Sequence, residues 1–183
     1  MIGLAFQFGQ AQNFVKSKLD SFFYELEMNN KFMGTVAVSQ NGKVIYLRTL
    51  GFSDIEKKIK VNENSKFRIG SISKTFTTVL VMKAAEEKKL DLEQTIAKFF
   101  PTIKNSDKIS IRHLLNHRSG IPNFTSKEDY LTWNTQPKSE NEMVEIIAKN
   151  GSDFEPDTKS EYSNSNFVLL TYILEKTYNK KYS

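Results

Sequence analysis

Residues 67–74 read FRIGSISK and contain a Ser-x-x-Lys pattern formed by Ser71 and Lys74. The apolar spacing that follows predicts a helix over residues 71–90, which places these two side chains on one helical face. A serine hydroxyl needs a base beside it to act as a nucleophile, and a lysine can serve as that base. The helix N-terminus would add a partial positive charge where an oxyanion forms. The pattern therefore indicates serine acyl-transfer chemistry.

A purely structural interpretation of the same residues stays open, with Ser71 as a helix cap and Lys74 as a surface cation, because Ser-x-x-Lys pairs arise readily by chance in a lysine-rich chain. The neighbouring sequence favours the catalytic interpretation. Apolar residues and a glycine precede the serine, and the helix after it is expected to be buried. Its predicted buried face consists of Phe76, Val79, Leu80, Met82 and Ala85.

Tyr162-Ser163-Asn164 is the second candidate for catalysis, and it precedes an apolar helix predicted over residues 164–178. A tyrosine near an ammonium group can have a lowered phenol pKa and exchange protons with a leaving group. An asparagine amide can orient both a lysine and a substrate carbonyl. A helix-capping asparagine beside a core tyrosine is the structural alternative.

Two other kinds of site are disfavoured by the spacing of their residues. His113 and His117 stand at i and i+4, but Leu114 replaces the glutamate of a His-Glu-x-x-His zinc motif, so hydrogen bonding at a helix end is favoured over metal binding. A phosphate-binding loop would need glycines at the positions of Ser73 and Arg68. We therefore expect no metal and no cofactor.

Composition predicts a globular domain, with 183 residues, 39% hydrophobic residues and 12% aromatic residues. The absence of cysteine excludes disulfides, thiolate zinc sites and a cysteine nucleophile. The net charge of +5 comes from lysines dispersed along the chain, which is typical of a solvated surface and not of nucleic-acid binding. No apolar run approaches the roughly 18 residues of a membrane span.

Periodicity predicts one hairpin and several helices. Strands over residues 33–40 and 44–51 flank Asn41-Gly42, a pair that favours a type I′ turn. A polar connection is expected over residues 54–64. Two strands alone are marginal in water, so this sheet should be completed by strands from elsewhere. Helices are predicted over residues 13–28, 71–90, 92–100, 110–116 with Ser110 as N-cap, 140–149 and 164–178.

Residues 1–11 form an apolar stretch that leads into Gly9-Gln10-Ala11, with small residues where a signal peptidase cuts. The basic segment that usually begins a signal peptide is absent. A signal-peptide remnant and an ordinary chain terminus both fit these residues. The first interpretation predicts a periplasmic or secreted protein.

Four blocks occur in order along the chain. They are residues 67–74, Leu90-Asp91-Leu92, residues 113–121 (HLLNHRSGI) and Tyr162-Ser163-Asn164. Together they resemble the serine β-lactamase and penicillin-binding protein superfamily, closest to class C β-lactamases, DD-peptidases and related esterases. The resemblance implies an α+β, β-lactamase/transpeptidase-like fold, in which an N-terminal helix and a β-hairpin of the central sheet precede a helical region.

The resemblance also implies roles for the candidate residues. Ser71 would be the nucleophile and Lys74 its base or proton relay. Tyr162 would pass the proton to the leaving nitrogen, and Asn164 would orient the lysine and bind the substrate amide. The block at residues 113–121 would be structural.

One family motif has no counterpart in this sequence. A Lys-Thr-Gly or His-x-Gly strand is expected after Asn164, yet residues 165–183 contain neither. The C-terminal strands and the closing helix are missing with it. Residues 12–183 are therefore expected to be the N-terminal portion of an incomplete domain, with little or no activity alone.

Three functional hypotheses follow from these observations. The first is a serine hydrolase that acts on β-lactams or D-Ala-D-Ala-type peptides through an acyl-enzyme at Ser71. The second is an esterase or D-aminopeptidase on the same scaffold. The third is a non-catalytic protein that binds peptidoglycan or peptides. The expected partners are a small-molecule or peptide substrate and a strand-completing chain or a swapped copy.

Overall fold

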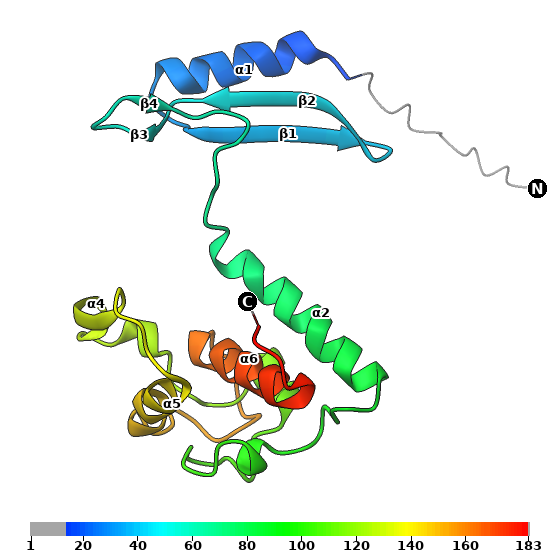
Figure 1. Ribbon diagram of the computed structural model, residues 1–183, viewed down its shortest axis with the longest axis vertical. Helices are drawn as coiled ribbons and strands as arrows, with labels where there is room; N and C mark the ends of the chain where they lie inside the picture. The colour runs from blue at the N-terminus through cyan, green and yellow to red at the C-terminus, as the bar shows by residue number, and fades with distance from the viewer. Residues whose placement is uncertain (1–13, 183) are drawn as a thin grey trace, which may run out of the picture. The chain divides into compact units, whose positions relative to one another are not determined.

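The computed structural model describes residues 14–182, and the chain divides between Arg68 and Ile69 into two compact units. Of the elements described, the first unit contains helix α1 and strands β1 to β4, and the second contains the other helices (Figure 1). The signal-peptide interpretation of residues 1–11 lies outside the described residues. Within residues 14–182, no helix is both long and apolar enough to cross a membrane.

The first unit is built on the predicted hairpin. Strands β1 (Gly34–Gln40) and β2 (Lys43–Leu50) pair antiparallel, and Gln40 lies opposite Lys43. Asn41 has φ 52° and Gly42 has φ 75°, the left-handed conformation that a type I′ turn requires at both positions. The hairpin prediction is therefore confirmed, with a bulge between Val38 and Ser39.

Helix α1 (Lys16–Met28) runs along the hairpin, as Figure 1 shows. The ring of Phe23 stacks on Tyr46 with 6.1 Å between centroids, and Tyr46 is buried. The Tyr46 hydroxyl donates to Asp20 Oδ1 at 3.1 Å. Arg48 Nη1 donates to the backbone oxygen of the same aspartate at 2.7 Å. One face of the two-stranded sheet is thus held against a helix by aromatic and polar contacts.

The connection predicted over residues 54–64 contains a second, very short hairpin. Strands β3 (Phe52–Asp54) and β4 (Ile59–Lys60) pair antiparallel, and Lys58 between them has φ 53°. The prediction of a polar connection did not include these two strands. Strands of three and two residues are too short to show a strand pattern, and the residues between them are mostly polar.

The second unit consists of short and medium helices. Three of its predicted helices are confirmed by the structure, namely α3 (Ile111–Leu115), α5 (Glu140–Lys149) and α6 (Asn164–Tyr178). Ser110 caps α3 as predicted, because its hydroxyl accepts from His113 N at 3.2 Å. The remaining elements of the unit are η1 (Gly70–Ile72), α2 (Ser73–Glu86), η2 (Ile96–Lys98), η3 (Phe124–Ser126) and α4 (Tyr130–Trp133).

The helix predicted over residues 92–100 is largely absent, and only the single turn η2 forms. The backbone before this turn is instead paired with the segment that leads into α3. Ile96 N donates to Ile109 O at 2.9 Å, and Ile111 N donates to Gln94 O at 3.2 Å. These bonds between distant residues hold the backbone extended there, so the local helical periodicity is overridden.

The prediction for α2 was right about the helix and wrong about its buried face. The helix begins with the turn η1 and ends at Glu86, after which Lys88 adopts φ 57°. Thr77, Val81 and Ala84 are buried. Large apolar side chains elsewhere on the helix are exposed instead, namely Phe76, Val79, Leu80 and Met82.

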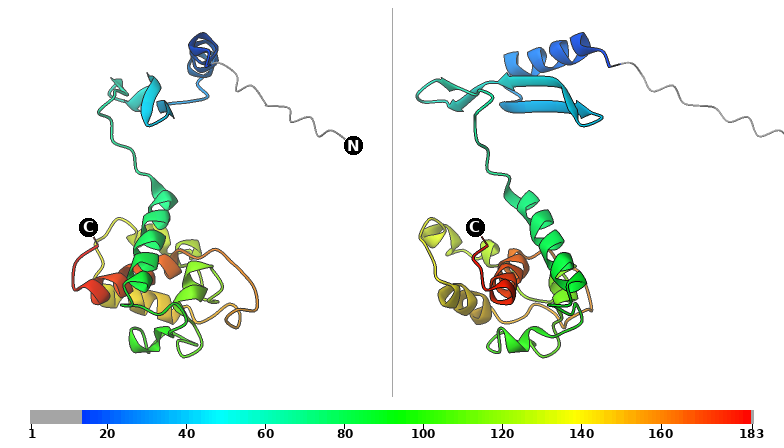
Figure 2. Two further views of the ribbon diagram at one scale, coloured as in Figure 1. Left: turned by 90° about the vertical axis from the view of Figure 1, so that its right-hand side faces the viewer. Right: turned by 45° about the vertical axis from the view of Figure 1, so that its right-hand side comes forward.

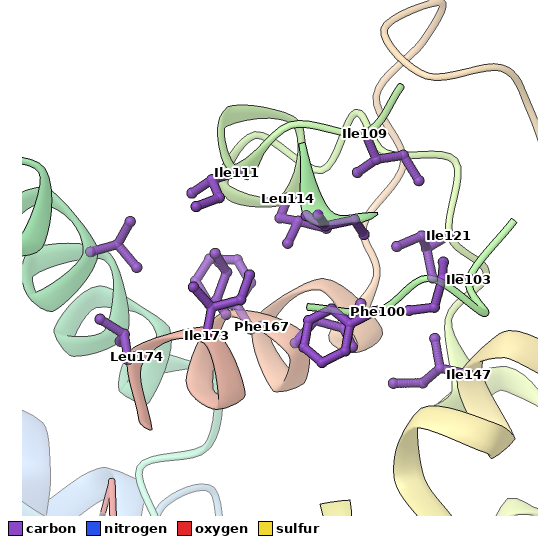
Figure 3. Close-up of a cluster of buried hydrophobic side chains, with 14 of the residues drawn as sticks. Phe100, Ile103, Ile109, Ile111, Leu114, Ile121, Ile147, Phe167, Ile173 and Leu174 are labelled. Atoms are coloured by element: carbon purple, nitrogen blue, oxygen red, sulfur yellow. The ribbon is translucent and has the colours of Figure 1, made fainter. Parts of the chain in front are cut away.

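The hydrophobic core of the second unit gathers around α6. This helix contacts α2, α3 and α5, and Figure 2 shows it crossing beside α2. Phe167, Ile173 and Leu174 on α6 meet side chains of the other elements in Figure 3. Those partners include Ile111 and Leu114 from α3, Ile147 from α5, and Phe100 and Ile103 from the loops. This core fixes α6, whose first residues belong to the candidate site.

Candidate active site

Ser71 lies in the turn η1, directly before α2. The preceding Gly70 has φ 54°, and open space surrounds the position that a Cβ would occupy, so the conformation and not crowding favours glycine. Ser71 is exposed. Lys74, one turn further along, donates from Nζ to Ser71 Oγ at 3.1 Å. The predicted Ser-x-x-Lys contact is present.

Tyr162 reaches the same serine from the segment that precedes α6. Its hydroxyl lies 2.8 Å from Ser71 Oγ, and its ring centroid lies 5.1 Å from Lys74 Nζ. The neighbouring Lys74 ammonium, and then the hydrogen bond with Ser71, hold the pKa of the Tyr162 phenol below its ordinary value. This phenol is therefore easier to deprotonate than that of a free tyrosine.

Asn164, the first residue of α6, joins the two groups that face Ser71. Its Oδ1 accepts from Lys74 Nζ at 2.8 Å and from the Tyr162 hydroxyl at 3.4 Å. The structure thus brings together Ser71, Lys74, Tyr162 and Asn164, all four residues that the sequence singled out.

Asn123 and Thr125 also belong to this arrangement, and the sequence reasoning missed both. Asn164 donates from its backbone N to Asn123 Oδ1 at 3.1 Å, and its Nδ2 donates to Asn123 Oδ1 at 3.2 Å and to Thr125 Oγ1 at 3.0 Å. Both residues lie shortly after the HLLNHRSGI block, which ends at Ile121. Neither lies in a spacing pattern, so no sequence signal beyond that adjacency could have found them.

A buried polar cluster joins the loop of residues 117–125 to the start of α6. Ser119 Oγ donates to Asn166 Oδ1 at 2.7 Å, and Ser165 Oγ donates to the Pro122 oxygen at 2.6 Å. These three polar side chains are buried. We call Ser119, Ser165 and Asn166 the buried polar cluster. Its hydrogen bonds join residues that lie in or directly after the HLLNHRSGI and Tyr162-Ser163-Asn164 blocks, and so hold the two segments together.

The two histidines form backbone hydrogen bonds, as the structural interpretation predicts. His113 Nδ1 accepts from Ser110 N at 3.2 Å, and His117 Nδ1 accepts from Ser163 N at 3.2 Å. The His117 ring also lies against Tyr162, with 4.6 Å between centroids. Burial, and then the charge of Lys74, hold the pKa of the His117 imidazole below its ordinary value. His117 supports Tyr162 as a neutral side chain.

A groove of about 420 Å³ adjoins Ser71 and Lys74. Its walls combine polar and apolar side chains. Phe124 comes from η3 and Tyr130 from α4, and Val168 and Thr171 come from α6. A small acyl substrate would have room to place its reactive carbonyl at Ser71 and an apolar group along these walls.

Comparison with protein families gives a match to the Beta-lactamase family model over residues 27–183. The chain belongs to this family. Its members and the relatives matched here are serine hydrolases of the β-lactamase and DD-peptidase type. The β-lactamase/transpeptidase-like fold expected from the sequence is confirmed, with helices and small antiparallel sheets.

Three relatives illustrate the position of the chain within the β-lactamase family. A teichoic acid D-alanine hydrolase of Staphylococcus aureus is 33% identical over 155 residues, which are 85% of this chain and 37% of the relative. The crystal structure of FmtA from Staphylococcus aureus matches with TM-score 0.76 and 31% identity, over 91% of this chain and 44% of that chain. The D-amino acid amidase of Ochrobactrum anthropi SV3, complexed with L-phenylalanine, matches with TM-score 0.76 and 28% identity, over 92% and 45%. The chain therefore spans less than half the length of these relatives.

Proposed function

We propose that this chain carries the nucleophilic site of a serine acyl-transfer hydrolase, with Ser71 as the nucleophile. The observation that carries the proposal is the contact of one hydroxyl with two proton-transfer groups, since Ser71 Oγ lies 3.1 Å from Lys74 Nζ and 2.8 Å from the Tyr162 hydroxyl. An exposed serine between an amine and an acidified phenol is the arrangement that activates a weak nucleophile. A surface serine with a structural role needs neither group.

In the proposed reaction, Ser71 Oγ forms a bond to the acyl carbon while its proton passes to the free amine of Lys74 as base or, with Lys74 as proton relay, on to Tyr162. The bond from the acyl carbon to the leaving nitrogen or oxygen then breaks, and Tyr162 transfers a proton to that atom. Water adds to the acyl-enzyme in the second half, and the proton path runs in reverse to restore Ser71. The N-terminus of α2 favours the oxyanion, since the helix begins at Ser73.

Asn164 is proposed to orient Lys74 through Oδ1 and to meet the substrate through its amide nitrogen. The first role has direct support in the 2.8 Å contact with Lys74 Nζ. The second role would require a substrate carbonyl to replace one of the two partners that Nδ2 has, Asn123 or Thr125.

Two acyl substrate classes fit this site, and both are proposed. β-Lactams and D-Ala-D-Ala-type peptides follow from the resemblance of the four sequence blocks. D-Aminoacyl esters or amides are favoured by the names of two relatives, a teichoic acid D-alanine hydrolase and a D-amino acid amidase. A non-catalytic protein that binds peptidoglycan or peptides is the remaining alternative.

The test is covalent labelling followed by intact-mass measurement. The purified chain is incubated with a fluorescent penicillin and, separately, with a D-alanyl p-nitrophenyl ester, and single-turnover rates are compared. We expect an adduct located at Ser71 and none in Ser71→Ala. Faster labelling by the ester would favour the D-aminoacyl class. Ligand binding that is equal in Ser71→Ala and the parent, with no adduct in either, would support the non-catalytic alternative instead.

Turnover by the 183-residue chain is proposed to be weak. The resemblance implies that the Lys-Thr-Gly or His-x-Gly strand supplies a second oxyanion donor, and residues 165–183 contain no such sequence. Loss of one such donor typically costs about 10² to 10³ in rate. Rapid hydrolysis of a chromogenic cephalosporin by the parent chain, absent in Ser71→Ala, would contradict this.

The hairpin sheet and the cellular location complete the proposal. Among residues 14–182, β1 pairs with β2 alone, so we propose that further strands, from a partner or a swapped copy, complete the sheet. We also propose a periplasmic or secreted location, because one relative is named for teichoic acid, a cell-envelope polymer. Fractionation of cells that express the chain tests the location directly.

A further inference from the structure

The Asn164 amide faces Lys74 on one side and a loop on the other, and its orientation decides what Lys74 meets. Oδ1 lies 2.8 Å from Lys74 Nζ, so the ammonium donates to an acceptor. If the amide were turned by half a rotation, Nδ2 would face the ammonium and two donors would oppose each other. Something must therefore fix the amide in the observed orientation.

Asn123 is the group that distinguishes the two orientations. Its Oδ1 accepts from Asn164 Nδ2 at 3.2 Å and also from Asn164 backbone N at 3.1 Å. In the turned orientation Oδ1 of Asn164 would face Oδ1 of Asn123, and two acceptors would oppose each other. The backbone bond keeps Asn123 in place whichever way the Asn164 side chain rotates.

The orientation of Asn123 is fixed by its own neighbours. Its Nδ2 donates to Ser126 Oγ at 2.8 Å, and its Oδ1 accepts a third hydrogen bond from Thr125 Oγ1 at 3.1 Å. Turning the Asn123 amide would break these bonds as well. Because the Asn164 backbone N can only donate, Asn123 must turn its Oδ1 toward it, and the orientation is passed from this N–H through Asn123 and the Asn164 amide to Lys74.

We propose that Asn123 is a positioning residue of the Ser71 site, whose carboxamide oxygen holds the Asn164 amide so that Oδ1 is presented to Lys74 Nζ. The consequence for the reaction rests on the function proposed above. The orientation itself does not, because it is a property of hydrogen bonds within residues 74–164. The two can therefore be tested separately.

The first measurement needs no variant. Both Nδ2 hydrogens of Asn164 should be bonded, one to Asn123 and one to Thr125, so both should exchange slowly with solvent. Their signals in a ¹⁵N-labelled chain are assigned by their loss in Asn164→Asp. Exchange of both hydrogens at the rate of an exposed amide, such as that of Asn141, would overturn the proposal even before any substitution is made.

The second measurement compares Asn123→Ala with Asn123→Asp. Alanine removes the acceptor, whereas a carboxylate keeps it, so aspartate should rescue what alanine loses. Asn141→Ala, on the exposed side of α5, is the matched control. The titration of Tyr162 reports the position of Lys74 without any substrate, and ¹³Cζ-labelled tyrosine makes it visible. We expect the Tyr162 pKa to rise toward 10.0 in Asn123→Ala and to stay lowered in Asn123→Asp.

Labelling of Ser71 gives the third readout. We expect Asn123→Ala to slow it by about tenfold to a hundredfold, as small displacements of catalytic groups do, and Asn123→Asp to restore most of the rate. If the parent does not label, the proposed function fails while the amide exchange and the Tyr162 titration still decide the role of Asn123. A Tyr162 titration unchanged in a folded Asn123→Ala would overturn the proposal.

Discussion

The two halves of the candidate site are held in different ways. Ser71 and Tyr162 are exposed, and the backbone beside Ser71 borders open space at Gly70. The buried polar cluster behind them has Ser165 and Asn166 completely buried and bonded to the loop of residues 117–125. Substrate access needs the first property, and fixed geometry needs the second.

This difference separates chemistry from stability within one site. Groups that meet the substrate make few contacts that folding depends on, so their loss should change rates and leave the fold intact. Groups in the buried polar cluster hold two chain segments together without touching the substrate. Their loss should lower the free energy of unfolding first. Single substitutions on each side of the site test whether that division holds.

Tyr162→Phe should have the largest effect after Ser71→Ala. The variant removes the hydroxyl that lies 2.8 Å from Ser71 Oγ and keeps the ring. General acid–base groups contribute roughly 10² to 10⁴ in rate, so labelling of Ser71 should slow by a factor in that range. The free energy of unfolding should change by less than about 0.5 kcal/mol, because the hydroxyl is at the surface. A large loss of unfolding free energy with an unchanged labelling rate would contradict the assignment of Tyr162 to chemistry and not to stability.

Asn166→Ala should show the opposite behaviour. The side chain is buried, and its Oδ1 accepts from Ser119 Oγ at 2.7 Å. Removing it leaves a buried hydroxyl without that acceptor and opens a small cavity, which together should cost about 3 kcal/mol of unfolding free energy. Thermal and urea unfolding measure the loss. The control is Asn141→Ala on exposed α5, which should stay close to the parent.

The sequence predicted the parts of the second unit that depend on neighbouring residues. The helices α3, α5 and α6 were found because capping residues and apolar spacing act within one or two turns. Ser71 and Lys74 were found for the same reason, since both lie in one turn. Tyr162 and Asn164 needed the resemblance of four ordered blocks in addition to their own chemistry.

The features that the sequence did not reveal depend on distant contacts. The segment before η2 is extended because Ile96 and Ile111 bond to residues far along the chain. Asn123 is visible as a site residue only once α6 is packed against its loop. The buried face of α2 is a third case, because a helix that is apolar on several sides does not specify which side meets its partner.

Val81→Ala and Val79→Ala compare the two sides of α2 with one residue type. Val81 is 0% exposed and Val79 is 60% exposed. Loss of buried methyl groups should cost about 2 kcal/mol at Val81. At Val79 the change should lie within about 0.5 kcal/mol, since alanine favours the helix and little packing is lost. Urea unfolding of both variants measures the two changes in unfolding free energy. Equal losses would show that the side of α2 that carries Val79 is covered in solution.

The smallest expected effect is the dependence of stability on pH at His117. Burial and the charge of Lys74 place its folded pKa below the ordinary value of 6.5, so the unfolded chain binds more protons between those two values. Stability should therefore fall as the pH drops below 6.5 and level off below the folded pKa, with a slope of at most about 1.4 kcal/mol per pH unit.

His117→Gln provides the measurement for this last prediction. The glutamine can still accept a hydrogen bond from Ser163 N but does not titrate, so the free energy of unfolding measured in urea between pH 7.5 and 5.5 should lose the pH dependence that His117 contributes. His113→Gln keeps His117 in place and should keep that pH dependence. If both variants behave like the parent, His117 is not held neutral behind Tyr162, and the buried polar cluster does not extend to the phenol. If the pH dependence of the unfolding free energy is lost only in His117→Gln, the His117 imidazole couples the buried polar cluster to Tyr162. Protonation of His117 at low pH would then destabilise the buried side of the site.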